Sequence, residues 1–282
     1  MRSKRRLRKT AGRVITYFVL CFVCLIILIP FFWMISTSLK SPDEIFDPSP
    51  KWIPENPTFD NYQSIWSRGN FTRQMLNSVI VAFCTTIISL IVAILSSYGL
   101  ARFDFKGKYT FSVLLIVVQM FPGVLLMIPL FTIMNKLGLI DQYWSLIISY
   151  CTFAVPFSTW MAKGYLDTIP VSLEDAARID GCNRLNVLWR VIIPLSAPGL
   201  VTVAIFAFVL AWQEYIFALT FTRTDIMRTI TVGISLMQGQ HGSVNWGEIM
   251  AGSVIACLPG IIFFTFMEKY LVKGFTLGAV KE

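Results

Sequence analysis

Six long apolar stretches without a charged side chain alternate with short charged segments along the chain. A helix rises about 1.5 Å per residue, so roughly 20 residues cross a hydrocarbon core about 30 Å thick. Because lipid offers the backbone no hydrogen-bond partner, each crossing segment must be helical. The pattern predicts an all-α polytopic membrane protein with six transmembrane helices. The predicted spans cover residues 14–36, 74–101, 109–131, 142–162, 196–218 and 249–267.

The composition agrees with a membrane protein rather than a soluble one. Hydrophobic residues make up 55% of the chain and charged residues 14%, whereas soluble domains carry about 25% charge. The formal net charge of +8 would suit nucleic-acid binding. However, the basic residues gather at the N-terminus and beside apolar runs, which is typical of a membrane surface. We therefore expect a lipid bilayer, and no nucleic acid, as a partner.

The first apolar run is predicted to be a retained span. Basic residues precede it, as they precede a signal peptide, but a signal core has only about 7–15 apolar residues and a small-residue cleavage site. The run in this chain is much longer and ends in Phe31-Phe-Trp-Met34.

Lysine and arginine residues fall mainly on one side of the predicted spans. Counted over alternate segments, 17 of the 24 lie on the side that holds both termini. The positive-inside rule makes that side cytoplasmic, so we expect a multi-pass protein of a bacterial-type plasma (inner) membrane with both termini inside. The predicted segments are a basic tail 1–13, an external loop 37–70, a membrane core 71–268 that contains the cytoplasmic loop 163–194, and a tail 269–282.

The two long external segments differ in character. Prolines recur in residues 37–71, which predicts an ordered but irregular loop with a short helix near Tyr62–Trp66. Residues 221–247 are rich in Gly, Thr and Ser and contain the sole histidine, His241, which we expect to be exposed.

The cytoplasmic loop carries clear helix signals. Ser172, followed three residues later by Asp175, fits a capping box. Glu174 and Asp175 place negative charge in the first turn, where the helix dipole favours it. Ala176 and Ala177 have high helix propensity and little bulk. We expect a helix of about two turns with a face of small residues.

Gly181 is predicted to end this helix, because glycine readily takes the left-handed conformation. A second helical segment is expected over Leu185–Val191, ahead of Ile193-Pro194. A short helix with small residues lets another protein approach closely. It would also serve as a plain connection between two spans, and the residues alone leave both interpretations open.

The same loop resembles the cytoplasmic "EAA" loop of permease subunits in binding-protein-dependent ABC importers. That pattern is Glu-Ala-Ala, three residues, Gly, nine residues and Ile-x-Leu-Pro. This chain has Asp175-Ala176-Ala177, Gly181 and Val191-Ile-Ile193-Pro194 at the same spacing. Asp stands where the family has Glu, and the neighbouring Glu174 offers a longer carboxylate for the same contact.

The resemblance extends over nearly the whole chain and is strongest to the carbohydrate-type, MalG-like branch. It implies the transmembrane domain of a type I ABC importer, in which a first span precedes a core of five that begins near Phe71. The further matching motifs are Ser36-Thr-Ser-Leu-Lys40, Asn77-Ser78, Tyr98-Gly-Leu-Ala-Arg102, Pro129-Leu-Phe131, Trp212-Gln-Glu-Tyr215 and Gly274-Phe-Thr-Leu-Gly278-Ala-Val-Lys281.

The resemblance also implies a function and a set of partners. The subunit would form half of a pore for a sugar, an oligosaccharide or a related polyol. Its partners would be a second homologous permease, two copies of a cytoplasmic ABC ATPase that uses ATP and Mg, and an extracytoplasmic solute-binding protein. The residues implied to dock the ATPase are Ser172, Glu174, Asp175, Ala176, Ala177, Asp180, Gly181 and Pro194.

The chain shows no motif for chemistry of its own. Gly107-Lys108 is followed by Tyr109 and lacks the earlier glycine of a phosphate-binding loop. No Ser/His/Asp arrangement is credible around the sole histidine, His241. Five of the six cysteines lie in apolar spans, where cysteine behaves as a small hydrophobe. We therefore expect no metal site, no bound cofactor and no enzymatic activity, with ATP hydrolysis on a separate subunit.

Polar residues inside predicted spans are costly, so each is a candidate for the solute pathway. Gln119 lies mid-span, just before Pro122 and Gly123, which are expected to bend the third span. Packing between helices is the alternative role for these polar groups. The candidates in the fifth span are Trp212, Gln213, Glu214 and Tyr215, where aromatic rings beside amide and carboxylate groups suit a sugar.

An ion-gradient-driven secondary transporter is the alternative function. It would require inverted repeats and buried carboxylates that coordinate ions. Only Glu214 comes close to that requirement, and no repeat is visible.

Overall fold

The computed structural model describes the backbone of residues 2–67, 69–237 and 244–278, and the side chains of residues 12–67, 69–237 and 244–270. His241 and the last four residues of the predicted tail lie outside these ranges. All regular structure in the described part is helical. The chain divides into two compact units, residues 1–69 with 236–255 and residues 70–235 with 256–282.

The first unit contains α1 (Arg2–Ser38), α2 (Pro42–Ile45), α3 (Asp60–Ser67) and the beginning of α13 (Trp246–Gly278). The predicted first span is confirmed as part of α1. None of the residues in its most apolar window is buried within the protein. A helix with apolar side chains on all sides and no protein cover matches a lipid-facing span.

The segment after α1 is an ordered loop, as predicted. The Asn61 amide donates to the backbone carbonyls of Ser38 (3.0 Å) and Lys40 (2.8 Å), and the Ser36 hydroxyl donates to the carbonyl of Trp52 (2.6 Å). These bonds replace regular secondary structure in satisfying the backbone. The expected short helix near Tyr62–Trp66 is present as α3.

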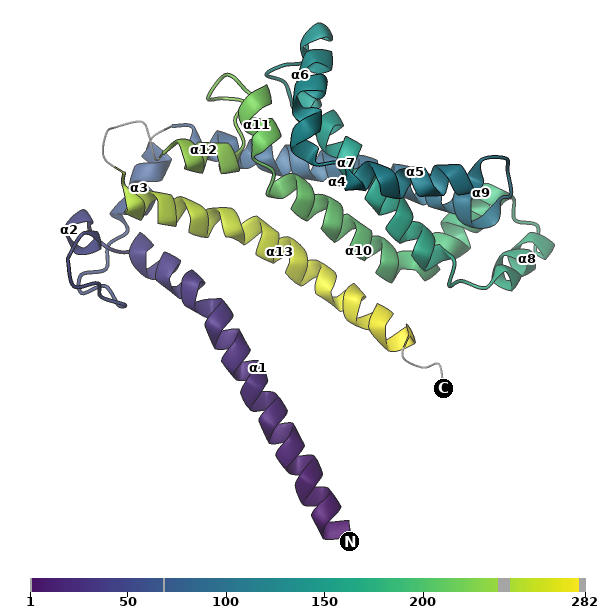
Figure 1. Cartoon of the computed structure of the whole chain (residues 1–282), viewed down its shortest axis with the longest axis horizontal. Coiled ribbons are helices and arrows are strands. Elements are labelled where there is room, and N and C mark those ends of the chain that lie inside the picture. Colours follow the sequence, from purple (N-terminus) through teal and green to yellow (C-terminus); the bar gives the residue numbers. More distant parts are fainter. Residues whose placement is uncertain (1, 68, 238–243, 279–282) are drawn as a thin grey trace. The chain divides into compact units, whose positions relative to one another are not determined.

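Three long helices form the core of the second unit. α4 (Phe71–Arg102) packs along α7 (Tyr143–Leu166) and α10 (Ile193–Trp212), which also contact each other (Figure 1). Small residues at helical spacing let the α4 backbone come close to its neighbours. The buried small residues of α4 include Ser78, Ala82, Thr85, Ser89, Ala93 and Ser97.

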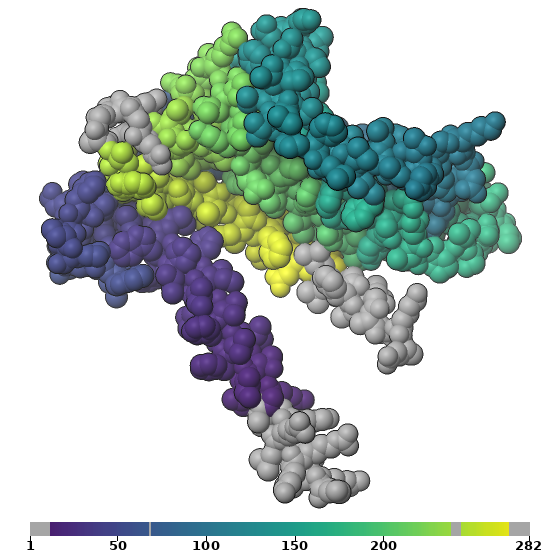
Figure 2. All heavy atoms as spheres, viewed as in Figure 1, coloured from purple at the N-terminus to yellow at the C-terminus, as the bar shows by residue number. Residues whose placement is uncertain are grey.

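The third predicted span, 109–131, is not one straight helix. It consists of α5 (Lys108–Met120), the 3-10 turn η1 (Gly123–Leu126) and α6 (Met127–Lys136), with a bend of 97° at the break. The expected bend at Pro122 and Gly123 is thus confirmed. It interrupts the helix completely, because α5 ends before it and η1 begins after it. α6 projects from the surface of the second unit (Figure 2). The described residues hold five helices able to cross a membrane, or six if this bent pair counts as one.

The fifth predicted span, 196–218, is wrong at its end. α10 stops at Trp212, and the short α11 (Ile216–Phe221) begins after a break; α12 (Ile230–Leu236) follows further along the chain. The Glu214 carboxylate accepts hydrogen bonds from the amides of Phe217 (2.8 Å) and Ala218 (3.0 Å). The side chain therefore starts a new helix where the apolar pattern suggested continuity.

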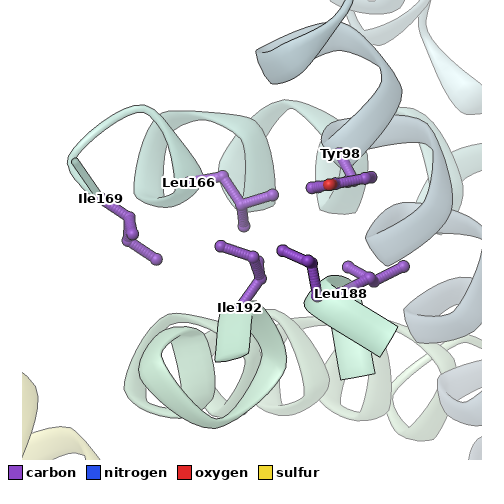
Figure 3. Close-up of a cluster of buried hydrophobic side chains, with 6 residues drawn as sticks. Tyr98, Leu166, Ile169, Leu188 and Ile192 are labelled. Carbon is purple, nitrogen blue, oxygen red and sulfur yellow. The ribbon is translucent and has the colours of Figure 1, made fainter. Parts of the chain in front are cut away.

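At the other end of the core, a buried apolar cluster joins the loop of residues 163–194 to α4 and α7 (Figure 3). The helical segments of this loop are α8 (Val171–Ile179), α9 (Arg184–Val187) and the π-helical η2 (Leu188–Ile192). The cluster holds the residues that lead into α10 against the ends of α4 and α7. Its members are Tyr98, Leu166, Ile169, Val187, Leu188 and Ile192.

One ion pair beside this cluster fixes α8. The Arg102 guanidinium donates through Nε to Glu174 Oε1 and through Nη2 to the carbonyls of Leu166 (3.1 Å) and Ile169 (2.9 Å). The Tyr98 hydroxyl donates to Glu174 Oε2 at 3.2 Å. The two charged side chains are only 9% and 8% exposed. The pair therefore ties the last turn of α4 to α8 and to the chain that leads into it.

Asp141, in the turn between α6 and α7, connects that turn to the segment after α11 through hydrogen bonds. Its carboxylate accepts from the amides of Arg223 (2.7 Å) and Thr224 (3.1 Å) and from the Thr224 hydroxyl (2.8 Å). Its own amide donates to the carbonyl of Phe221. Burial raises the pKa of Asp141, but these hydrogen bonds outweigh it and hold the pKa below the ordinary 3.8.

Arg102→Met should loosen the loop of residues 163–194. It leaves the buried Glu174 carboxylate without its counter-charge and with the Tyr98 hydroxyl as its remaining side-chain donor, a loss that costs about 3–5 kcal/mol. We expect faster hydrogen exchange across residues 166–181, measured by mass spectrometry on the solubilised protein. The double variant Arg102→Met/Glu174→Leu should recover much of the protection, because it removes both charges. Equal protection in wild type and Arg102→Met would contradict the role of the pair.

Asp141→Asn should reveal a pH-dependent contribution to stability. A lowered folded-state pKa stabilises the protein above the unfolded pKa, and this contribution is lost as the pH falls through the folded value. Wild type should therefore melt above Asp141→Asn at pH 7, with a difference that shrinks as the pH falls below the ordinary carboxyl pKa of 3.8. Asparagine also tolerates the left-handed backbone of this position, φ 63°. Asp104→Asn, at a fully exposed side chain, is the control. A difference in melting temperature between wild type and Asp141→Asn that did not change with pH would contradict this explanation.

Candidate functional site

The helix of the loop predicted to be cytoplasmic begins earlier than the capping box predicts. Val171 is the first residue of α8, Pro170 occupies the cap position without a side-chain hydrogen bond, and Ser172 lies inside the helix. The predicted capping box is therefore wrong. The ring of Pro170 presets its φ at −60° and leads the chain into the helix two residues before Ser172. Glu174 lies in the first turn, as expected.

Gly181 ends α8 in the left-handed conformation, φ +87°, as predicted. The amides of Gly181 and Cys182 donate to the carbonyls of Arg178 (3.1 Å) and Ala177 (3.0 Å), which closes the turn. Asn183 then caps α9 by accepting from the Asn186 amide at 2.8 Å. The sequence offered a signal for this cap, an asparagine directly before the second helix, but the prediction did not use it.

The predicted second helical segment is present and continues into the membrane. α9 and η2 run into α10 without a break, and the exposed Pro194 falls in the first turn of α10. Proline has no amide to donate, and the helix adjusts just before it: the Ile193 amide donates to the carbonyl of Leu188, five residues back, in the π-helical segment.

The exposed side of the loop combines apolar and charged side chains. Ile179 is 86% exposed, although isoleucine is among the residues most often buried. Exposed apolar groups rimmed by polar ones mark a surface that another protein covers. The other exposed large apolar side chains of the loop are Val171, Leu173, Leu185 and Trp189.

The residues implied to dock a partner separate into two groups. Ser172, Asp175, Ala176, Asp180, Gly181 and Pro194 are exposed. Ala177 is half-buried against the apolar cluster. Glu174 is buried against Arg102, so the expectation that its carboxylate reaches a partner is wrong. Helix periodicity explains the difference, because Glu174 and Ala177 are three residues apart and share the inner face of α8.

Two helix breaks meet around a concave site of about 650 Å³ in the second unit. One break follows Gln119 in the α5–α6 pair, and the other lies between α10 and α11. Irregular backbone at membrane depth is tolerated where it is buried in protein or lines a water-filled cavity. The lining residues are Gln119, Phe121, Gly123, Tyr150, Phe153, Leu210, Gln213, Glu214, Tyr215, Ile216 and Phe217.

Four of the five predicted pathway residues line this cavity. Gln119 donates to the carbonyl of Phe153 at 2.8 Å, and Gln213 is exposed. Glu214 caps α11 and also accepts, through its backbone carbonyl, from the hydroxyl of Thr231 at 2.8 Å. The Tyr215 hydroxyl accepts from Ser235 at 3.0 Å. These bonds position the polar wall of the cavity.

Trp212 is the exception, since it does not line the cavity. Its indole N–H donates to the carbonyl of Ala256 at 3.2 Å, and its ring stacks on Phe208 with centroids 5.6 Å apart. The aromatic wall comes instead from Phe121, Tyr150 and Phe153. Sequence reasoning missed these rings, because an aromatic residue in an apolar span gives no sign of the direction it faces.

The comparisons with known proteins identify the family. The sequence profile described as "Binding-protein-dependent transport system inner membrane component" matches residues 86–277. The chain is 34% identical to the inner membrane ABC transporter permease protein YcjP of Escherichia coli, covering 97% of this chain and 98% of that protein. It is 37% identical to the trehalose/maltose transport system permease protein MalG of Thermococcus litoralis, covering 92% and 93%.

A third relative and two solved structures agree. The chain is 37% identical to the sulfoquinovosyl glycerol transport system permease protein SmoH of Agrobacterium fabrum, over 90% of this chain and 89% of that protein. The fold is similar to a bacterial ABC transporter that imports the acidic polysaccharide alginate, with a TM-score of 0.76, 24% identity and 91% and 95% coverage. The MetNI methionine ABC transporter gives a TM-score of 0.57 at 16% identity, covering 75% and 97%.

The three relatives each match 90% of the chain or more, and the residues 86–277 matched by the family profile contain both the loop and the cavity residues. The chain therefore belongs to the family of binding-protein-dependent transport system inner membrane components, as a pore-forming ABC permease subunit whose ATPase is a separate subunit.

Proposed function

We propose that this subunit imports a sugar, an oligosaccharide or a related polyol, and that the cavity at the two helix breaks is its part of the solute path. The observation that carries the proposal is the composition of the cavity wall. Amide, hydroxyl and carboxylate groups face aromatic rings across about 650 Å³. Two relatives are permeases named for trehalose/maltose and for sulfoquinovosyl glycerol, which supports a carbohydrate-like solute.

The wall suits a polyhydroxylated molecule better than a charged or a purely apolar one. The Gln213 side chain makes no hydrogen bond among the described residues, so its amide is free to bond a hydroxyl. Phe121 and Phe153 offer apolar surface for the carbon face of a ring. Both oxygens of Glu214 already accept backbone amides, which leaves little capacity for the ion coordination that a secondary transporter would need.

The cytoplasmic loop is proposed to dock the ATPase. Ile179 and the exposed residues around the Gly181 turn would enter a groove on that subunit, while Arg102 and Glu174 hold the loop from behind. The full importer would contain a second homologous permease, two copies of the ATPase with its ATP and Mg, and an extracytoplasmic binding protein. Both termini would be cytoplasmic, in agreement with 17 of the 24 basic residues on that side.

Gly181→Val should release the ATPase without preventing membrane insertion. A β-branched residue at φ +87° is strained even though the space around Gly181 is open. We expect a large loss of co-purifying ATPase and of ATP-driven uptake. Gly138→Val is the matched control, because Gly138 is also left-handed, φ +69°, and also open, but lies in the turn after α6. Wild-type ATPase yield in Gly181→Val would overturn the docking role.

Gln213→Ala should raise the KM of uptake for the transported sugar. Loss of one hydrogen bond of about 0.5–1.5 kcal/mol corresponds to roughly a 2- to 13-fold change. Trehalose and maltose are the first probes, measured in cells that carry the complete importer. Gln142→Ala, an amide outside the cavity that bonds only the carbonyl of Gly138, is the control. An unchanged KM with normal assembly would remove Gln213 from the solute path.

A further inference from the structure

The first unit contains a second cavity, of about 340 Å³, that has no part in the proposed solute path. It lies where α1 ends and is closed by α2 and the first turn of α13. Three aromatic rings form much of its wall, those of Trp33, Phe46 and Trp246. Its polar lining comes from Thr37, Lys40 and Glu44.

Lys40 is a buried cation, and the chain satisfies only part of its hydrogen-bonding capacity. Its side chain is 2% exposed, donates to the carbonyl of Lys51 and lies 4.4 Å from the ring centroid of Trp33. An ammonium group has three N–H donors, and a single carbonyl takes one of them. Within the described residues no carboxylate forms an ion pair with Lys40. A buried charge without a counter-charge is costly, so the cavity favours an anion.

Thr37 supplies a second, independent indication of a ligand. It lines the same cavity, is 5% exposed, and its hydroxyl oxygen has no hydrogen-bond partner among the described residues. Buried hydroxyls are normally bonded, and an unsatisfied one costs about 1–3 kcal/mol. Thr37 lies in the last turn of α1, Lys40 lies two residues beyond its end, and both line the same cavity.

The position of Lys40 just after α1 indicates which anion is available. The 26 residues from Arg13 to Ser38, where α1 ends, correspond to about 39 Å of helix, close to the 40–45 Å of a bilayer with its head groups. If Arg13 lies in one head-group layer, Lys40 reaches the other. Trp33 and Trp246 suit this level, because tryptophan is enriched at membrane interfaces. The exposed apolar side chains of Ile29 and Phe32 lie on α1 just before the cavity.

We propose that this cavity binds the head group of a zwitterionic phospholipid of the phosphatidylethanolamine type. The phosphate accepts hydrogen bonds from Lys40 and Thr37, and the acyl chains run along the apolar surface of α1. The ammonium group of the lipid lies towards Glu44, one of whose oxygens accepts the amide of Glu55 at 2.9 Å while the other stays available. A neutral sugar would leave the charge of Lys40 uncompensated, which favours the lipid.

The experiment uses the full-length chain purified in detergent and titrated with short-chain phosphatidylethanolamine, with tryptophan fluorescence and native mass spectrometry as readouts. We expect one lipid bound to wild type and at least about tenfold weaker binding to Lys40→Met, since the lost bond involves a charged donor. Thr37→Val, which keeps the shape of the side chain, should weaken binding by a smaller factor. Lys51→Met, at a half-exposed lysine paired with Asp47 and Glu55, should bind as wild type.

Three results would overturn the proposal. Wild-type binding in both Lys40→Met and Thr37→Val would remove the phosphate site. Inorganic phosphate, or maltose, that binds as tightly as the lipid would make the cavity a site for a soluble ligand. Phosphatidylglycerol that binds equally well would show that Glu44 does not select an ammonium group. Because Thr37→Val is close in shape to the native residue, its helix content and melting temperature separate loss of lipid from loss of fold.

Discussion

The buried pair of Arg102 and Glu174 is the interaction on which the loop of residues 163–194 depends. Arginine is suited to this place because its planar group bonds one carboxylate and two backbone carbonyls at once. The carbonyls belong to Leu166 and Ile169, where α7 ends. A single side chain at the end of α4 thus holds the end of α7 and the beginning of α8 together. The surface that carries Ile179 and Gly181 is rigid from behind, as a docking element requires.

The cavity depends on a different constraint, the need of every backbone group for a partner inside the membrane. Two helices break near the same place. At one break Glu214 supplies the missing partner by accepting the first amides of α11, and at the other Gln119 holds the end of α5 to α7 by donating to the carbonyl of Phe153. The polar groups needed to satisfy a broken backbone also give the cavity its polar wall. The break and the candidate binding site are therefore two consequences of one arrangement.

α10 connects the two regions mechanically. It begins at Ile193, directly after the loop, and ends at Trp212, directly before the cavity residues. Its 20 residues extend about 30 Å. It packs closely against α7, since a Cβ on Gly199 would meet the ring of Tyr165. A continuous helix, with no flexible linker, therefore joins the loop to the cavity wall.

The sequence by itself determined the class of the protein, the positions of its apolar helices, the turn at Gly181 and the bend at Pro122-Gly123. These features follow from local causes: apolar length, the conformational freedom of glycine and the missing amide of proline. Of the five residues that it predicted for the solute pathway, four line the cavity, because polar groups in apolar spans stand out. Only the tertiary structure decided which way side chains face. It turned Glu174 inward to Arg102, turned Trp212 away from the cavity, and brought Tyr150 and Phe153 into the wall. Direction depends on what each helix packs against, and that is set by residues far away in the chain.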